Sequence, residues 1–407
     1  MVGEAVAVTG IGLLTAAGCD AETTWKNLCT GRSLAASNPE FGGLAVDISC
    51  DVADFDAVAE LGGRLARRLD RFAHLGIAAA RRAVADADLR IADGPAERVG
   101  VVLGVGSNSL RTYVAEFTRL GQGRPAAVSP LALPRSVPNM VAGEIALDVG
   151  ARGPNFTVSS ACASGSHALG VARGMLLGGL CDVVLAGGSE SWSRMSAVCF
   201  SQMGALSRRT DRPHLASRPF DRGRDGFVLG EGAAVVVLER LDHVRARGAS
   251  PRALLCGYGA SADAYHPTAP HPHGAGAEQA VRQALADAAC TPGDIGHVNA
   301  HGTSTVLGDA AEAVMLRRVF GSRVPPVTAT KSIIGHTMGA AGAIEAAVTV
   351  LALEQQAVPP TANVNEQDPG RELDIVTGAP RPVDFSRALS TSFAFGGQNA
   401  ALVFATA

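Results

Sequence analysis

The chain has 407 residues, of which 47% are hydrophobic and 18% charged, and its formal net charge is −3. This composition is typical of a large folded protein with an aliphatic core, and it excludes a disordered chain. The weak net charge gives no global basic field for nucleic acid, and no apolar run approaches the roughly 20 residues of a membrane-spanning helix.

Apolar runs alternate with helical patterns along the first half of the chain. The pattern predicts strands and helices in this order: strand 4–13, helix 70–88, strand 98–106, strand 155–160, helix 164–179 and strand 182–188. This alternation predicts an α/β protein with largely buried strands. The N-terminus lacks the basic segment of a secretion signal, and the eight cysteines are scattered without a C-x-x-C pair, so we expect a cytoplasmic protein with reduced thiols.

The chain also contains an internal repeat. Residues 226–239 (GFVLGEGAAVVVLE) and 392–405 (SFAFGGQNAALVFA) superpose without gaps. Each segment predicts a strand, a glycine turn and a second strand, so that a hairpin closes each half of the molecule. Chance similarity between two apolar hairpins is the alternative. The repeat favours a duplicated fold, with an N-terminal half at residues 1–250 and a C-terminal half at residues 251–407.

Cys162 lies where a predicted strand ends and a predicted helix begins, among alanine, serine and glycine residues. The positive end of a helix dipole stabilises a thiolate and lowers the pKa of a cysteine. Small neighbours allow a sharp turn and the approach of an extended acyl group. Taken alone, this cysteine is better explained as a small buried core residue.

Three later segments place chemically active groups at other strand ends or helix starts. His301 follows a short apolar strand, Lys331 and His336 lie before an alanine-rich helix, and residues 392–399 supply a glycine turn. Lysine occurs only twice in the chain, at Lys26 and Lys331. A lone histidine would be read as a core residue, but the combination with Cys162 predicts a catalytic site.

These motifs resemble the β-ketoacyl-acyl carrier protein synthases, specifically the elongating type with a Cys–His–His set. The resemblance extends over essentially the whole chain, and five separated motifs occur in the family's order. It implies a thiolase-type duplicated fold with five α-β-α-β-α layers, in a homodimer or a heterodimer with a chain-length-factor-like subunit. It also implies decarboxylative Claisen condensation of an acyl group with malonyl-acyl carrier protein, in type II polyketide, polyene or fatty-acid biosynthesis.

The resemblance assigns a role to each group of the site. Cys162 would hold the acyl chain, and neutral His301 and His336 would stabilise the malonyl-derived enolate oxygen. Lys331 would hold His336 neutral and order the network. The backbone N–H groups of Cys162 and Phe395 would form the oxyanion hole, and the Phe395 ring would act as a gate.

Supporting roles follow from the same resemblance. Thr303 and Thr305 would bind the phosphopantetheine of the carrier protein, and the enzyme itself would need no cofactor and no metal. Glu312 and Glu345 would orient the network, although helix-surface charges are the alternative. Phe200 would line the acyl channel, although an ordinary core phenylalanine is equally credible.

The basic residues assigned to carrier-protein docking are Arg67, Arg68, Arg208 and Arg209. Solvated surface charge is the alternative for all four. Three histidines between residues 266 and 273 lie among prolines, which predicts a surface loop rather than a metal site.

Two positions near the C-terminus depart from the family's usual turn, which has glycine and threonine where this chain has Ala394 and Gln398. We expect a stiffer gate and a specialised enzyme, with a housekeeping fatty-acid elongation enzyme as the alternative. A coenzyme A-dependent thiolase or priming synthase could use Asn399, but the paired histidines and Lys331 argue against it. A non-catalytic chain-length partner usually lacks the nucleophile, so Cys162 argues against that class.

Overall fold

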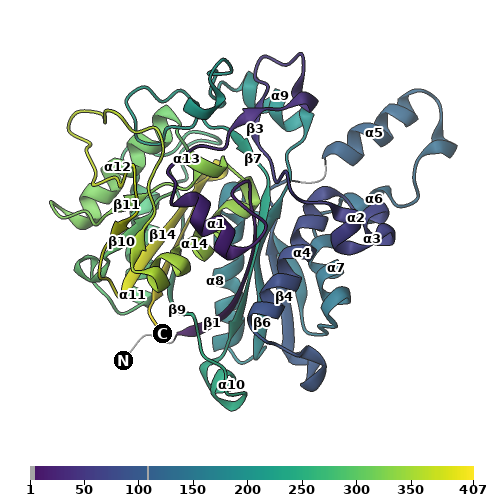
Figure 1. Cartoon of the computed structure of the whole chain (residues 1–407), viewed down its shortest axis with the longest axis horizontal. Coiled ribbons are helices and arrows are strands. Elements are labelled where there is room, and N and C mark those ends of the chain that lie inside the picture. The colour runs from purple at the N-terminus through teal and green to yellow at the C-terminus, as the bar shows by residue number, and fades with distance from the viewer. Residues whose placement is uncertain (1–4, 108–109) are drawn as a thin grey trace.

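The computed structural model describes residues 5–107 and 110–407 (Figure 1). Its main strands form a ten-stranded network in the order β11-β10-β14-β15-β9-β1-β8-β6-β4-β5. The first half contributes β1 (Val6–Leu14), β4 (Val99–Gly104), β5 (Asn155–Val158), β6 (Val183–Glu190) and β8 (Gly232–Glu239). The second half contributes β9 (Ala253–Ala262), β10 (His297–Asn299), β11 (Val327–Thr328), β14 (Arg387–Ala394) and β15 (Gln398–Ala405).

The two halves repeat the same strand order and the same strand directions. In the first half, β1 pairs antiparallel with β8, β8 antiparallel with β6, and β4 parallel with both β6 and β5. The strands β9, β15, β14, β10 and β11 repeat this pattern in the second half. The half-sheets join where Val6–Val8 of β1 pairs antiparallel with β9. The fold is therefore duplicated.

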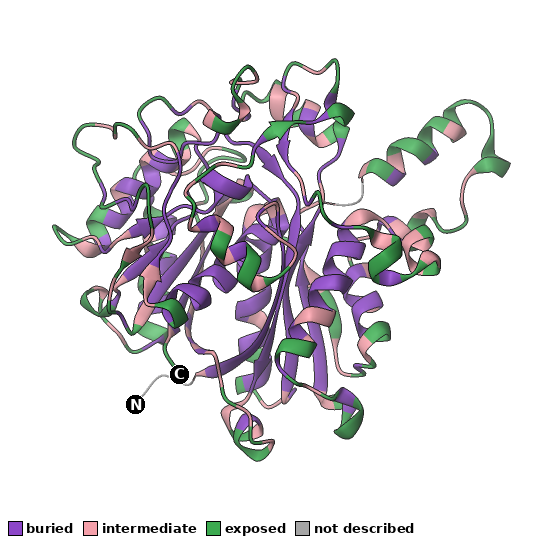
Figure 2. Ribbon diagram, in the orientation of Figure 1, coloured by how far each residue is buried: buried purple, intermediate pink, exposed green. Residues whose placement is uncertain are grey.

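Helices complete five layers around these half-sheets (Figure 1). The outer face of the first half is covered by α4 (Arg71–Asp86) and α7 (Met140–Val149), and that of the second by α11 (Ala275–Asp287) and α12 (Val306–Phe320). Between the half-sheets lie α8 (Ser164–Leu177) and α14 (Ala341–Gln355). Figure 2 shows that most of the main strands and the central helices are buried, whereas β5 at the edge of the first half is partly exposed. Burial is expected for α14, which is apolar all round.

The remaining elements decorate this frame. The short helices are α1 (Ala21–Leu28), α2 (Ala57–Leu61), α3 (Gly63–Arg68), α5 (Leu110–Gly121), α6 (Ala132–Ser136), α9 (Arg194–Gln202), α10 (Leu241–Ala246) and α13 (Lys331–Ile334). One small sheet contains β2 (Ala36–Ser37), β3 (Ile48–Cys50) and β7 (Leu229–Gly230). Another contains β12 (Ala357–Val358) and β13 (Arg381–Pro382). Together, α5 and α6 project from the body (Figure 1). In the part of the chain that the structure describes, no helix is long and apolar enough to span a bilayer.

One of the two predicted hairpins is wrong. Residues 392–405 form the hairpin β14–β15, as expected. In the segment 226–239, however, β7 pairs with β3 in a separate sheet, and β8 pairs with β1 and β6 instead. The backbone of Leu229–Gly230 instead pairs with β3 on one side, and Gly230 donates its N–H to the backbone oxygen of His336. The predicted boundary at residue 250 lies between α10 and β9 and stays a prediction.

Candidate active site

Cys162 lies on a single 3₁₀ turn, Ala161–Ala163, between β5 and α8. Ala161 has a positive φ of 47°, a left-handed conformation that is uncommon for a residue with a side chain. Ser164 fixes the turn because its hydroxyl donates to the Ala161 oxygen at 2.6 Å and accepts the Ser160 N–H at 2.9 Å. The predicted sharp turn is therefore present, and it directs Cys162 into a cavity.

The electrostatics of Cys162 differ from the sequence-based expectation of a lowered pKa. Burial raises the pKa of the thiol to about 12, and the positive charge of Lys331 only partly opposes this effect. The loss of solvation outweighs the attraction of nearby positive charge because water no longer stabilises the thiolate. Cys162 is therefore a neutral thiol at physiological pH.

A cavity of about 410 Å³ brings most of the predicted site residues together. Its wall includes Cys162, Phe200, His301, Thr303, Thr305, Glu312, His336 and Phe395. Lys331 and Glu345 are fully buried behind this wall. Residues far apart in the chain thus share one cavity: Cys162 on the first half and Phe395 on the second are separated by 233 positions.

Glu312 anchors the turn that carries His301. Its carboxylate on α12 accepts the backbone N–H of His301 at 2.8 Å and that of Gly302 at 2.8 Å. The Thr391 hydroxyl on β14 donates to the same carboxylate at 2.9 Å. Glu312 therefore acts on the backbone of the histidine turn, as an orienting residue should, and the surface-charge alternative is wrong because Glu312 is 3% exposed.

Lys331 contacts His301 rather than His336. Its Nζ lies 3.3 Å from Nδ1 of His301 and donates to the His301 backbone oxygen at 2.7 Å. It also forms a buried ion pair with Glu345. As expected, the charge of Lys331 helps to keep His336 neutral, and it acts on His301 in the same way. The direct contacts of Lys331 with His301 were not predicted.

The two imidazoles face one another with ring centroids 5.6 Å apart. Burial and the charge of Lys331 lower the pKa of His301 and the pKa of His336 well below 6.5, so both rings are neutral at physiological pH. Nδ1 of His336 accepts the Met338 N–H at 3.3 Å, and Nδ1 of His301 faces the Lys331 ammonium. Since both Nδ1 atoms face donors, each ring carries its proton on Nε2 and can donate from there.

Phe395 begins the turn between β14 and β15 and lies beside Phe200 of α9, with ring centroids 6.2 Å apart. Gly396 and Gly397 have φ values of 82° and 68°, which glycine adopts without strain. This turn packs against the turn that carries Cys162. The Gln398 side chain lies against the Gly396 face of the turn, since a Cβ on Gly396 would be 3.0 Å from its Nε2.

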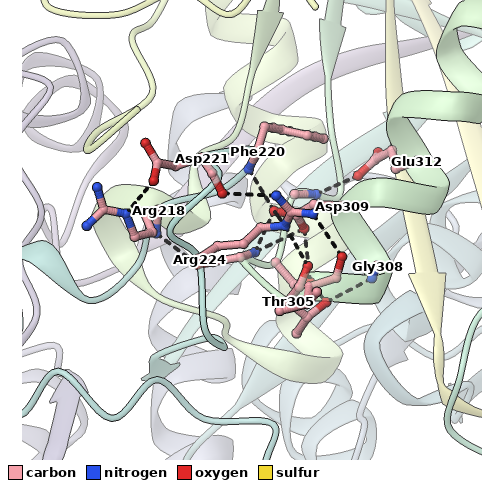
Figure 3. Close-up of polar contacts among 12 residues, drawn as sticks. Arg218, Phe220, Asp221, Arg224, Thr305, Gly308, Asp309 and Glu312 are labelled. Atoms are coloured by element: carbon pink, nitrogen blue, oxygen red, sulfur yellow. Dashed lines mark hydrogen bonds and ion pairs between the residues drawn. The ribbon is translucent and has the colours of Figure 1, made fainter. Parts of the chain in front are cut away.

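Thr303 and Thr305 lie on the cavity wall with their hydroxyls 2.9 Å apart (Figure 3). Behind them, the Asp309 carboxylate accepts the backbone N–H of Ser304 at 3.1 Å, and the Arg224 guanidinium donates to the backbone oxygen of Thr305 at 3.2 Å. Burial raises the pKa of Asp309 to about 7. The sequence analysis did not identify Asp309 or Arg224 as residues of the site.

The four docking arginines fall into two separate groups. Arg208 and Arg209 adjoin Asp225, a residue of the cavity wall: the Arg208 N–H donates to its carboxylate at 3.2 Å. Arg67 and Arg68 lie on α3, beside α4 in Figure 1, and Arg68 forms an ion pair with Glu144. Because Arg208 is exposed next to the cavity, Arg208 and Arg209 are better placed than Arg67 and Arg68 for docking at the cavity.

The histidine-rich segment forms a loop, as expected, and part of this loop lines the cavity. Nδ1 of His266 accepts the Thr268 N–H at 3.1 Å, and Nδ1 of His271 accepts the His273 N–H at 3.3 Å. Within residues 5–107 and 110–407, the side chains of histidine, cysteine, aspartate and glutamate form no group suited to a metal ion.

Comparison with known protein families decides the classification. The model of the β-ketoacyl synthase N-terminal domain matches residues 3–243, and that of the β-ketoacyl synthase C-terminal domain matches residues 252–365. The chain belongs to the β-ketoacyl synthase family.

Individual relatives agree with this classification. The 3-oxoacyl-[acyl-carrier-protein] synthase 2 of Vibrio harveyi is 42% identical over 405 residues, which cover 98% of each chain. The ishigamide ketosynthase/chain length factor structure matches with a TM-score of 0.93 and 32% identity over 100% of both chains. A type II PKS acyl-carrier protein in complex with its ketosynthase matches with a TM-score of 0.92 and 28% identity, again over 100% of both chains. The predicted thiolase-type fold is thereby confirmed, and this β-ketoacyl synthase is a condensing acyltransferase.

Proposed function

We propose that this β-ketoacyl synthase condenses an acyl group held on Cys162 with malonyl-acyl carrier protein, and that it releases β-ketoacyl-acyl carrier protein and CO₂. The observation that carries the proposal is one cavity whose wall contains Cys162, His301 and His336, with the Nδ1 atom of each imidazole facing a donor. The carrier's phosphopantetheine would enter past Thr303 and Thr305, and the enzyme would need no cofactor of its own. We expect it to act in the cytoplasm.

In the first half-reaction, the Cys162 sulfur attacks the carbonyl carbon of the acyl thioester. The developing oxyanion accepts hydrogen bonds from the backbone N–H groups of Cys162 and Phe395, whose turns pack together. The carbon–sulfur bond to the carrier then breaks, and the departing pantetheine thiolate takes up the proton that the Cys162 thiol has lost. The acyl group is left on Cys162.

In the second half-reaction, the bond between the malonyl α-carbon and its carboxylate breaks and CO₂ leaves. The electron pair forms an enolate on the thioester, whose oxygen accepts hydrogen bonds from Nε2–H of His301 and of His336. Neutral donors suit this step because decarboxylation creates the nucleophile without a base. The enolate carbon attacks the acyl carbonyl, and Cys162 leaves as a thiolate that takes a proton from solvent.

For the pathway, we propose type II polyketide or polyene biosynthesis. The ketosynthase structures described above and the unusual Ala394 and Gln398 at the gate support this choice. Fatty-acid elongation is the second candidate, favoured by the 42% identity to a 3-oxoacyl-[acyl-carrier-protein] synthase 2.

For the assembly, we propose a homodimer or a heterodimer with a chain-length-factor-like subunit. Large apolar side chains on the projecting arm support this, since Phe117 of α5 is 67% exposed and Leu133 of α6 is 64% exposed. The two helices are in contact, and contiguous apolar exposure is typical of a surface that a partner covers. Acyl carrier protein would dock at the cavity mouth beside Arg208 and Arg209.

Mass spectrometry of the protein incubated with acyl-carrier thioesters tests the proposal. We expect a mass increase by one acyl group, mapped to the peptide of Cys162, followed by release of β-ketoacyl-carrier and CO₂ when malonyl-carrier is added. Cys162→Ala is the matched control and should take up no acyl group. Acylation of Cys181, Cys199 or Cys256 with Cys162 unmodified would overturn the mechanism, and turnover with coenzyme A thioesters alone would favour a thiolase.

A further inference from the structure

Glu190 is a buried carboxylate at the end of β6 to which neither half-reaction assigns a role. It is 2% exposed. Its Oε2 accepts the N–H groups of Gly106 at 2.7 Å, Ser107 at 3.1 Å and Gly339 at 3.2 Å. Its Oε1 accepts the Ser107 hydroxyl at 2.9 Å. One carboxylate thus joins the end of β6, the loop after β4 and the 3₁₀ turn Met338–Ala340.

The segments around Glu190 are packed too closely for other side chains to enter. A Cβ on Gly339 would lie 2.1 Å from the Gly106 nitrogen, and a Cβ on Gly106 would lie 2.9 Å from the Gly339 nitrogen. The two backbones therefore touch, and their N–H groups converge on the same oxygen of Glu190. Buried N–H groups need an acceptor, and an ionised carboxylate is a strong one.

The turn that Glu190 holds also determines the state of a catalytic histidine. Gly339 directly follows Met338, whose N–H donates to Nδ1 of His336 at 3.3 Å. Met338 has a positive φ of 48°, a conformation that needs external support in a residue with a side chain. The same turn packs against the turn that carries Cys162.

We propose that Glu190 is a positioning residue for the malonyl half-reaction. Its carboxylate holds Gly339, and thereby the Met338 N–H, so that His336 accepts at Nδ1 and presents Nε2–H to the enolate oxygen. The turn of Cys162 has its own hydrogen bonds through Ser164, so acylation depends less on Glu190. This inference rests on the proposed condensing activity.

The test compares Glu190→Gln with Glu239→Gln, a change of another buried carboxylate on the same pair of strands. Glu190 pairs with Gly232 and Glu239 pairs with Val183, so the two carboxylates lie at opposite ends of β6 and β8, roughly 23 Å apart at about 3.3 Å per residue. In the first variant, a neutral amide oxygen, a weaker acceptor than a carboxylate, faces the three backbone N–H groups, and the amide NH₂ faces the Ser107 hydroxyl, which must turn to accept. Each enzyme is loaded with acyl-carrier, freed of excess donor and mixed with malonyl-carrier, and both the acylation rate and single-turnover CO₂ release are measured.

For Glu190→Gln we expect CO₂ release and β-ketoacyl product to fall about 10- to 100-fold, since small misplacements of a catalytic group have effects of this size. Acylation of Cys162 should stay within about threefold of the wild-type rate. Glu239→Gln should leave the ratio of the two half-reactions unchanged, even if its melting temperature falls. Should Glu190→Gln fail to fold, Glu190→Asp, which is too short to reach all three segments, replaces it.

Two results would overturn the inference. One is an equal loss of acylation and CO₂ release, which would show a merely structural role. The other is a wild-type ratio of the two rates in Glu190→Gln. If the wild-type enzyme forms the acyl-enzyme but never releases CO₂ from malonyl-carrier, the proposed function itself fails. This outcome is distinct because Glu239→Gln would then release no CO₂ either.

Discussion

The ammonium of Lys331 lies 3.3 Å from Nδ1 of His301 and donates to the backbone oxygen of the same residue at 2.7 Å. One charge thus fixes both the tautomer and the backbone of His301, while a backbone N–H from Met338 fixes the tautomer of His336. Each histidine therefore presents its own Nε2–H donor, and a different group holds each ring in that tautomer. Substitutions at Lys331 should therefore act mainly through His301.

Lys331→Arg should lower condensation by about 100-fold or more. Lys331 is 2% exposed, and a planar guanidinium cannot reproduce its contacts with His301 and Glu345 in that space. Lys26→Arg, on the exposed face of α1, is the matched control and should retain full activity. Steady-state assays with malonyl-carrier measure both variants. Wild-type rates in Lys331→Arg would show that the lysine is incidental.

His301→Ala and His336→Ala should each reduce condensation by about two to three orders of magnitude, because each removes one donor from the enolate oxygen. Acylation of Cys162 should persist in both variants, since neither imidazole holds the Cys162 turn. Acyl-enzyme formation by mass spectrometry and CO₂ release from malonyl-carrier separate the two effects. Near-normal condensation in either variant would mean that the enolate is stabilised elsewhere.

The sequence predicted those parts of the site that depend on local pattern. Cys162, His301, Lys331 and His336 each stand at a strand end or helix start, and the fold brings them together as expected. The direct contact of Lys331 with His301 was not predicted, because proximity in sequence to His336 does not show which imidazole an ammonium contacts across layers. The pKa of Cys162 was misjudged for a related reason: burial depends on the packing of both halves.

Glu190 and Asp309 were missed for the same physical reason. Both are acidic residues whose roles come from backbone N–H groups of distant segments, and no periodicity or motif marks such contacts. The hairpin at 226–239 failed because glycine turns between apolar runs do not reveal whether the first run pairs with the second. Here the first run pairs with β3, and Gly230 donates its N–H to the backbone oxygen of His336.

His297 should make the protein acid-sensitive. Burial lowers its pKa from 6.5 to about 3, and neither ring nitrogen has a hydrogen-bond partner. The unfolded chain therefore binds a proton that the folded protein excludes, and stability is lost as pH falls below 6.5. Between pH 7.5 and 5 this contribution is about 2 kcal/mol. His297→Leu should lose correspondingly less stability over that range in urea unfolding. Identical pH profiles for the two proteins would refute this assignment.

Alkylation of Cys162 by iodoacetamide should rise about tenfold for each pH unit and show no plateau up to pH 9, because only the thiolate reacts and burial raises the pKa of this thiol to about 12. Peptide mapping follows Cys162 alone, and N-acetylcysteine in the same buffers supplies the reagent control. Lys331→Met should slow the reaction further at every pH, since the positive charge of Lys331 lowers the pKa of Cys162. A plateau below pH 7.5 would instead show that the start of α8 stabilises the thiolate more than burial opposes it, and the resting nucleophile would then be charged.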